Sequence, residues 1–388
     1  MGNMKLIIFT LALANFGVGT GGLIIAGVLP QIAASLAVSL PQAGALLGYS
    51  SIAYALGAPL LGAALWRLDR KQVLIGGLMV MTIASMVGAL SSSYAVVLIS
   101  RIIFASASAV VTPTTLSVVA FLTAPDERGK VISRVFGGFA LSNVVGLPLG
   151  VMIAAVSDWQ VALWYAAAVS AAAAVMVGKY LPSKIQVPPS NFAVLGAFLL
   201  DWRKMAVVFI VVLQMAAVFV VYTYLTAWLT QVLGLSQQAV TWMLLWFGLF
   251  GTIGVFSAGE LMQRFNHHKL MVVLLIALVV IHTSFSWIPA SIPLVMLVLA
   301  CWGLFGFAFQ PVHQTRVIHV SGTSANAGIT LHASGVYVGQ ALGAFVGGAM
   351  LAGGGMASLG WTAAAGAMAA LGLMLVTFRT TRNQIAAK

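Results

Sequence analysis

The sequence has 388 residues, of which 61% are hydrophobic and only 6% are charged, and its mean hydropathy is +1.08. Because a soluble globular protein carries about 25% charged residues, this composition excludes a soluble enzyme, a secreted domain and a disordered chain. The net charge of +12 is by itself compatible with nucleic-acid binding, and a single cysteine, Cys301, excludes an intrachain disulfide.

Apolar runs follow one another along almost the whole chain. A helix needs roughly 20 mostly apolar residues to cross a membrane. Runs of this kind cover residues 6–29, 43–65, 73–92, 95–118, 132–156, 160–180, 205–230, 239–262, 270–288, 293–313, 327–351 and 358–378. Turn formers and charges separate them, as at 91–93 and 353–355. The sequence therefore predicts an all-α integral membrane protein with 12 transmembrane helices.

The longest polar stretch separates the sixth and seventh runs, which predicts an amino-terminal six-helix bundle over 1–180, a cytoplasmic linker over 181–204 and a carboxy-terminal six-helix bundle over 205–388. Counted through alternating loops, all but one of the 18 basic residues fall on one side. Lys and Arg mark the cytoplasmic side of a membrane protein. We therefore expect both termini in the cytoplasm, and the net charge is interpreted as an orientation signal rather than as a nucleic-acid interface.

Two separate patterns recur at one offset of 197 residues. The matched residues are Gly62 with Gly259, Arg67 with Arg264, Asn143 with Gln340, Gly146 with Gly343, and Gly150 with Gly347. Small-residue patterns are common in membrane helices, so either match alone is weak. The shared offset predicts a six-plus-six duplication, the kind of internal repeat from which many transport proteins are built.

Several segments carry a resemblance to a known family. They are FGVGTGGLIIAGVLPQIAASLAVS from Phe16, YALGAPLLGAALWRLDRK, Arg101 in the fourth run, APDERGKVISRVFGGFALSNVVGLPLG at 124–150 with Asp158 and Trp159 after it, and ANAGITLHASGVYVGQALGAFVGG at 325–348. In these segments the chain resembles the twelve-span drug:proton antiporter group of the major facilitator superfamily, and most of all its arabinose-efflux-permease-like branch. The resemblance implies two six-helix bundles and export of a small molecule, and it does not identify the substrate.

The basic loop after the second run resembles the family's loop, in which Gly permits close helix contact and a carboxylate with Arg or Lys latches one bundle against the other. This sequence has Trp66 at the family's Asp position and Asp69 at a later Gly position. Asp69 with Arg67 and Arg70 would have to rebuild the latch, and a solvated positive-inside loop is the alternative. The equivalent loop in the second half carries Gly259 and Arg264.

Gly146, Pro148 and Gly150 resemble the family's glycine–proline motif in the fifth span, which is tied to export. A proline frees a backbone carbonyl and kinks the helix, while glycine lets helices approach closely. Close packing alone is the alternative explanation. The complete set expected to govern conformational gating is Gly62, Arg67, Asp69, Arg70, Gly146, Pro148, Gly150, Gly259 and Arg264.

Arg101 is the one basic residue expected within a span, roughly 10 Å from its outer end at 1.5 Å per residue. A charge in such a position usually faces the bundle interior and marks a functional site. The resemblance links this arginine to proton coupling and substrate binding, and an arginine that snorkels to the outer interface is the alternative.

All six acidic residues map to loops or to the ends of runs. Relatives carry an acid in the first span at the position of Gly22. With no acid at mid-depth, His332, His313 or Glu260 would have to bind the proton, because a neutral histidine titrates in the useful range. A hydrogen-bonded structural role is the alternative for His332. Proton coupling therefore rests on family analogy, and a proton-independent facilitator of the same fold stays open.

Polar and aromatic side chains are expected to line a central cavity. The predicted substrate-binding and coupling residues are Asn15, Thr20, Arg101, Asn143, Gln214, Tyr222, Trp246, His332, Tyr337 and Gln340. Asn143 and Gln340 would bind a polar substrate or serve purely structural contacts. Apolar and aromatic walls with a few polar groups are typical of ligand sites. Without a carboxylate in the cavity, we expect neutral or anionic substrates rather than lipophilic cations.

The sequence thus predicts a secondary active transporter that exports a small neutral organic molecule, of drug, sugar or nucleoside type, by alternating access and proton antiport. It contains no Walker motif and no paired metal-ligand spacing, so we expect no cofactor, with the proton gradient as energy source. The expected partners are the substrate, protons and membrane lipids, and no nucleic acid, for a monomer in the bacterial inner membrane. An integral-membrane enzyme and a non-transporting sensor are the alternatives from other classes.

Overall fold

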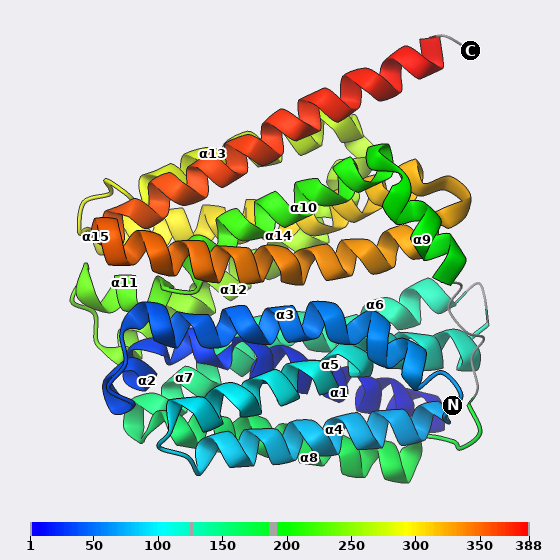
Figure 1. The fold of residues 1–388 in the computed structure, drawn as a ribbon, viewed down its shortest axis with the longest axis horizontal. Coiled ribbons are helices and arrows are strands. Elements are labelled where there is room, and N and C mark those ends of the chain that lie inside the picture. Colours follow the sequence, from blue (N-terminus) through cyan, green and yellow to red (C-terminus); the bar gives the residue numbers. More distant parts are fainter. Residues whose placement is uncertain (1, 125–126, 186–191, 387–388) are drawn as a thin grey trace. The chain divides into compact units, whose positions relative to one another are not determined.

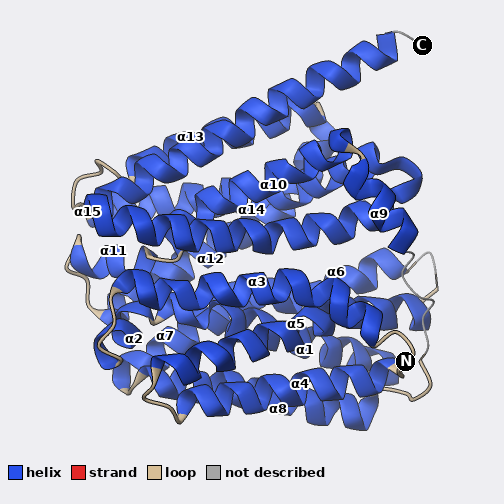
Figure 2. Ribbon diagram, viewed as in Figure 1, coloured by secondary structure: helices blue, strands red, loops and turns tan. Residues whose placement is uncertain are grey.

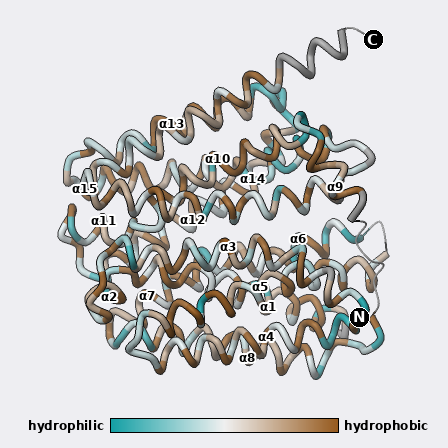
Figure 3. Tube along the Cα trace, in the orientation of Figure 1, coloured by the Kyte–Doolittle hydropathy of each residue, from teal (hydrophilic) through white to brown (hydrophobic). Residues whose placement is uncertain are grey.

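The computed structural model describes residues 2–124, 127–185 and 192–386, and within these ranges every regular element is a helix (Figure 2). Eleven helical segments of this described part of the chain are long and apolar enough to cross a membrane. Apolar residues run along the helices, and hydrophilic residues gather mainly near helix ends and connections (Figure 3). The predicted all-α membrane class is confirmed, while the count of twelve spans and the orientation of the termini stay predictions.

The chain divides into two compact units, one formed by Met1–Ser190 with Leu235–Leu245 and the other by Asn191–Gly234 with Trp246–Lys388 (Figure 1). The boundary at Ser190 falls within the expected linker. Residues 235–245, which sequence reasoning gave to the carboxy-terminal bundle, belong to the first unit, so α12 (Gln237–Arg264) contributes to both units.

The first unit contains a series of helices in chain order. They are α1 (Gly2–Gly27), α2 (Leu29–Ser35), α3 (Leu40–Ala64), α4 (Arg70–Ala89), α5 (Tyr94–Leu122), α6 (Arg128–Leu141), the π-helical η1 (Ser142–Gly146), α7 (Leu147–Val156) and α8 (Trp159–Tyr180). A capping box at Ser39 and Gln42 begins α3, and the Asp69 side chain caps α4, so polar residues set these helix starts as expected from their orphan backbone amides.

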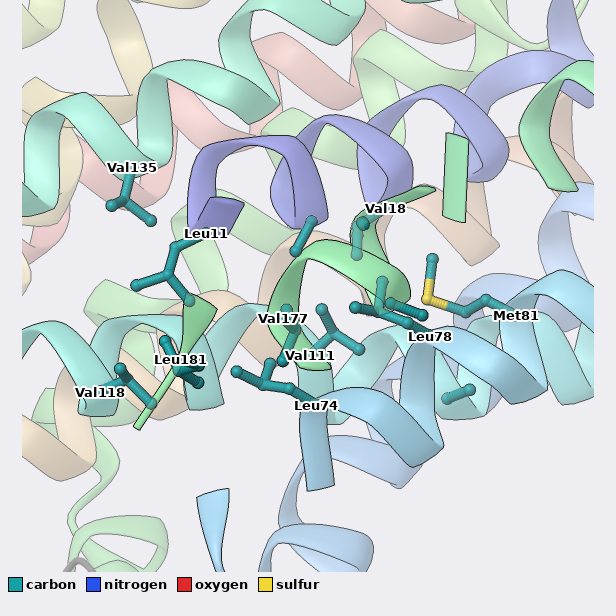
Figure 4. Packing of buried hydrophobic residues seen from close by; sticks show 14 of the residues in the cluster. Leu11, Val18, Leu74, Leu78, Met81, Val111, Val118, Val135, Val177 and Leu181 are labelled. Atoms are coloured by element: carbon teal, nitrogen blue, oxygen red, sulfur yellow. The ribbon is translucent and has the colours of Figure 1, made fainter. Parts of the chain in front are cut away.

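The core of the first unit lies between α1, α4, α5, α6 and α8. Figure 4 shows buried aliphatic side chains from these helices packed together, among them Leu11, Val18, Leu74, Leu78, Met81, Val111, Val118, Val135, Val177 and Leu181. Leu181 extends this core beyond the last residue of α8, because the chain after Tyr180 stays packed against the bundle. The start of the expected linker is therefore part of the first unit's core.

The second unit contains α9 (Phe192–Leu200), α10 (Trp202–Tyr222), α11 (Leu225–Gln231), most of α12, α13 (His267–Ser284), α14 (Ile292–Ser321), the 3₁₀ turn η2 (Gly322–Ser324) and α15 (Ala325–Ala386). Helix α9 lies in the stretch that was expected to be a polar linker. Its sequence FAVLGAFLL is apolar, and Phe198 is buried in a cluster with Val207, Val208 and Val317. That part of the linker is thus a packed helix.

Helix α15 is interrupted at Gly355, whose φ of 68° and ψ of −169° are not helical. This region of backbone space is essentially restricted to glycine. The interruption falls in the predicted break at 353–355 and divides the apolar segment Ala327–Phe378 into residues 327–354 and 356–378. Each part has the length that a membrane crossing requires, roughly 20 residues.

Candidate functional site: buried polar side chains in the two units

Arg101 lies on α5 and is only 2% exposed. Its Nη2 donates to Ser85 Oγ at 3.3 Å, and its guanidinium lies 4.8 Å from the ring centroid of Phe104. Nε and Nη1 have no hydrogen-bond partner. The interior position expected for this charge is confirmed, and the snorkelling alternative does not fit a buried guanidinium. A buried cation with two unpaired donors retains capacity to bind an anion or a carbonyl oxygen.

Two other predicted residues of the first unit are Asn15 on α1 and Asn143 in η1. Asn15 is fully buried and donates to Thr115 Oγ1 at 2.8 Å and to the Leu11 carbonyl at 3.0 Å, so it ties α1 to α5 while its own Oδ1 stays unpaired. Asn143 donates to the Phe139 carbonyl at 3.1 Å. These bonds are structural, and the role of Asn15 and Asn143 in substrate binding stays a prediction.

Gly146 of the glycine–proline motif ends a π-helical turn, and Pro148 and Gly150 lie in the helix α7 that follows. Residues Ser142–Gly146 are π-helical, the Leu147 amide donates to the Ser142 carbonyl, and Pro148 follows at the start of α7. A β-carbon on Gly146 would lie 2.1 Å from Thr20 Oγ1, so glycine is required for α1 and η1 to approach this closely. Thr20 is fully buried and its hydroxyl has no partner. The helix is irregular just before Pro148, where it forms a π turn, a feature often found at functional positions, and the kink and its role in gating stay predictions.

The basic loop before α4 is organised around Asp69. The carboxylate accepts hydrogen bonds from the backbone amides of Lys71 at 3.1 Å, Lys184 at 2.8 Å and Ile185 at 3.1 Å. Burial opposes ionisation, but the amides of Lys184, Lys71 and Ile185, together with the Lys71 charge, outweigh it and lower the pKa of Asp69. Asp69 therefore holds the chain segment that follows α8.

No ion pair joins Asp69, Arg67 and Arg70 among the described residues, and the latch between the bundles stays a prediction. Arg70 donates instead to the Trp66 carbonyl at 3.2 Å, and Arg67 lies over the Trp66 ring at 5.2 Å. A β-carbon on Gly62 or Gly259 would meet no atom within 4 Å, so close packing does not require glycine at either position. Arg264 ends α12 and is exposed.

The predicted polar residues of the second unit lie on α10 and α15. Gln214 is 0% exposed and neither its Nε2 nor its Oε1 has a partner. Gln340 is buried and Tyr337 is half-buried, both on α15. A buried amide without partners is expensive in an apolar environment, and such a group needs an explanation in ordered water or a ligand. Gln214 is therefore the residue of this set with the largest unmet hydrogen-bonding capacity.

The two predicted aromatic residues lie in different surroundings. Tyr222 is buried among Phe219, Phe247 and Trp302, with ring centroids 5.4 to 6.3 Å away. Trp246 donates to the Met296 carbonyl at 3.0 Å and lines an apolar groove of about 420 Å³ between α12 and α14. Tyr222 belongs to the aromatic core, whereas Trp246 is placed where an apolar molecule or lipid chain can lie.

Sequence reasoning missed the burial of Arg316. It was assigned to a cytoplasmic loop, but α14 continues to Ser321 and leaves Arg316 inside the helix and only 7% exposed. Nη2 donates to Thr377 Oγ1 at 2.8 Å and Nη1 contacts Met374 Sδ. The apolar residues Val317, Ile318 and Val320 after Arg316 were a signal that the helix continues.

The histidines predicted as proton-binding candidates come together. His313 on α14 and His332 on α15 are buried and stacked, with ring centroids 5.2 Å apart and ring planes at 26°. The described acidic residues lie at helix ends, as predicted. Four of them immediately precede helices: Asp69, Glu127, Asp158 and Asp201. Glu260 is exposed in the last turns of α12, and Asp126 lies outside the described residues. No cluster of potential metal ligands occurs in the described part of the chain.

Comparison with known proteins decides the family. The model of the Major Facilitator Superfamily matches residues 11–329. The chain belongs to this superfamily. It is 27% identical to the uncharacterized MFS-type transporter YbcL of Bacillus subtilis, with 97% of each chain covered, and 27% identical to a chloramphenicol resistance protein of Streptomyces lividans, with 90% of each covered.

The fold agrees with this assignment. A crystal structure of a bacterial homologue of the human lysosomal transporter Spinster, inward-facing and occupied, matches with a TM-score of 0.79 over 98% of each chain at 15% identity. The resemblance identified from the sequence motifs is therefore confirmed. The chain is a multi-pass membrane transporter of this superfamily, and its relatives are transporters rather than enzymes.

Proposed function

We propose that this transporter exports small neutral organic molecules across the bacterial inner membrane by alternating access, in exchange for protons. The observation that carries the proposal is the kind of polar group that the membrane-spanning helices bury. Asn15, Gln214 and Gln340 are buried amides, whereas the five described carboxylates lie at helix ends. Amides pair with hydroxyl, carbonyl and amide groups of neutral molecules. A lipophilic cation would find no counter-charge there.

Relatives support this substrate class. The Streptomyces lividans relative is named for resistance to chloramphenicol, a neutral molecule that carries hydroxyl and amide groups. The unpaired Gln214 side chain and the free Nε and Nη1 donors of Arg101 are the groups in this chain best suited to such a molecule. Alternating access follows from the superfamily's two-bundle design, in which one half moves against the other around the substrate.

Reconstituted protein tests the proposal. In liposomes whose interior is more acidic than the medium, we expect radiolabelled chloramphenicol to accumulate inside as protons leave. Tetraphenylphosphonium serves as the cationic control and should not accumulate by the same route. Saturable uptake of the cation by the protein would contradict the proposed substrate class. Gln214→Leu should weaken chloramphenicol uptake, because the amide is lost while the volume is nearly kept.

A proton-independent facilitator is the second candidate, favoured by the position of the described acids at helix ends rather than at mid-depth. The same vesicles separate the two functions. If collapsing the pH gradient with an ionophore changes neither the rate nor the final level of chloramphenicol inside, antiport is wrong and facilitated diffusion is the function.

A further inference from the structure

Three helices of the second unit meet at one histidine. His313 of α14 is 0% exposed, and its Nε2 lies 3.0 Å from the carbonyl oxygen of Val207 on α10. A carbonyl oxygen only accepts hydrogen bonds, so Nε2 must carry the hydrogen. In the neutral ring, Nδ1 is then a bare acceptor, and it has no partner. The geometry thus leaves one defined atom to which a proton can be added.

Two rings stack on His313. The Phe309 ring centroid lies 5.3 Å away with the planes at 14°, and the His332 centroid lies 5.2 Å away with the planes at 26°. The face of an aromatic ring attracts a cation, and this attraction grows when the cation is removed from water. Protonation at Nδ1 would place an imidazolium against both rings while Nε2–H keeps its bond to Val207. The face of the Phe309 ring therefore offers stabilisation of a positive charge without a carboxylate.

The charged groups around the pair favour release of the proton rather than its retention. Helix α14 contributes Arg316, one turn beyond His313, and His319. Helix α13 contributes His267, and the start of α10 contributes Lys204, which is paired with Asp201 at 3.4 Å. Helix α9 has no charged residue, and residues 327–378 of α15 have none besides His332. Asp201 is the one acid among the described residues of these helices and their caps, and it forms an ion pair with Lys204.

An apolar cluster borders the pair. Val207 and Val317 belong to a buried group with Phe198, Val208 and Ala327, against which Leu331 packs. His313 Nδ1 is itself buried. A proton can therefore reach or leave Nδ1 only when the helices move, and such conditional access is what an exchange cycle needs.

We propose that His313 is the proton-binding residue of this transporter, with Nδ1 taking up the proton while the rings of Phe309 and His332 face the imidazolium. The step is a simple protonation of a neutral imidazole, and its reversal returns the proton to water. The role of this site in transport rests on the proposed antiport, whereas protonation of the site itself does not.

Histidine NMR tests protonation without any substrate. All six histidines lie in the second half of the sequence, which keeps the spectrum simple. In purified protein labelled with ¹⁵N-histidine, we expect one ring that stays hydrogenated at Nε2 and gains a proton at Nδ1 as the pH falls. Its signals should vanish in His313→Gln, and His332→Phe should change its titration while leaving the ring stack. A His313 ring that stays neutral wherever the protein remains folded would overturn the proposal.

Transport assays test coupling. In His313→Gln we expect loss of chloramphenicol accumulation driven by the pH gradient, with chloramphenicol exchange in the absence of a gradient retained. His282→Gln is the matched control, since His282 is equally buried in the same unit but meets Trp302 edge-on and has no carbonyl partner. Full gradient-driven accumulation in His313→Gln would overturn the coupling role. If wild-type protein shows no such accumulation, antiport fails as a function, and the NMR titration alone decides the site.

Discussion

Asp69 in the first unit and Asn266 in the second occupy equivalent positions, 197 residues apart, and both cap the helix that follows a short basic loop. Asn266 accepts from the amides of His268 and Lys269. Asp69 caps α4 and in addition holds the amides of Lys184 and Ile185. A carboxylate has two acceptor oxygens and an amide has one. Both matched positions thus cap a helix, and the acid in the first unit makes a second contact that fixes the chain after α8.

The repeated glycines differ in a similar way. In the first unit, β-carbons on Gly146 and Gly150 would meet the side chains of Thr20 and Ile24. In the second unit, β-carbons on Gly343 and Gly347 would meet the backbone of α10, with the Ala216 carbonyl oxygen only 2.4 Å from the first. A side chain can turn aside, whereas a helix backbone cannot. The interface of α15 with α10 is therefore the less tolerant of the two.

The largest effect is expected from Gly343→Ala. Because the added methyl meets backbone, the helices must separate, and overpacking of this kind costs about 1–3 kcal/mol. Gly146→Ala should cost less, and Thr20→Ala in the same protein should recover part of that loss by removing the hydroxyl. Thermal unfolding of the purified variants measures both. Equal losses at the two glycines would show that the interfaces do not differ as described.

The buried arginines supply the next contrast. Arg316 makes contacts through both terminal nitrogens, whereas Arg101 makes one hydrogen bond and has two unpaired nitrogens. Arg316→Leu should therefore lower the stability by about 2 kcal/mol through lost charge-assisted hydrogen bonds. Arg101→Leu should leave the stability unchanged or raised, because it removes an uncompensated buried charge. A stability loss in Arg101→Leu as large as in Arg316→Leu would contradict the comparison.

The smallest loss of stability is expected when the helix caps Asp69 and Asn266 are removed. Asn266→Ala should destabilise the protein by about 1 kcal/mol, the usual loss of a helix cap, and Asp69→Ala should cost somewhat more because it also loses the bonds from Lys184 and Ile185. Only the Asp69 contribution depends on pH. Its folded pKa is lowered below 3.8, so its stabilisation is fully present above the unfolded pKa and is lost as pH falls through the folded value. Chemical denaturation at neutral and at acidic pH gives the free energy of unfolding of each variant and so separates them. In Asp69→Asn the cap should contribute the same stabilisation at both pH values, as Asn266 does.

The sequence alone predicted those features that depend on the free-energy penalty for placing one charged side chain in the membrane interior. A membrane interior penalises acids, so their placement at helix ends followed from the apolar runs alone. The interior position of Arg101 followed for the same reason. The glycine repeat was predicted from matches at a single offset, and close contact with a neighbouring helix explains glycine at Gly146, Gly150, Gly343 and Gly347 but not at Gly62 or Gly259.

The missed features depend on contacts between helices that are distant in the sequence. In a membrane, helices are apolar on every side, so the pattern of residues does not reveal which neighbour a given face meets. For that reason the bond from Asp69 to Lys184, the stack of His313 on His332 and the packing of α9 could not be predicted. The end of α14 was misplaced because a positively charged residue, Arg316, was taken as a membrane boundary when its partners lay on α15.

The joint at Gly355 has a mechanical consequence. A single residue with a backbone conformation that other residues cannot adopt connects the two straight parts of α15. Such a connection contains no spare chain length, so displacement of the end of one part must be accompanied by displacement of the start of the next. Residues 327–354, which carry His332 and the glycines packed on α10, are in this way linked to residues 356–378, which carry the Met374 and Thr377 contacts of Arg316.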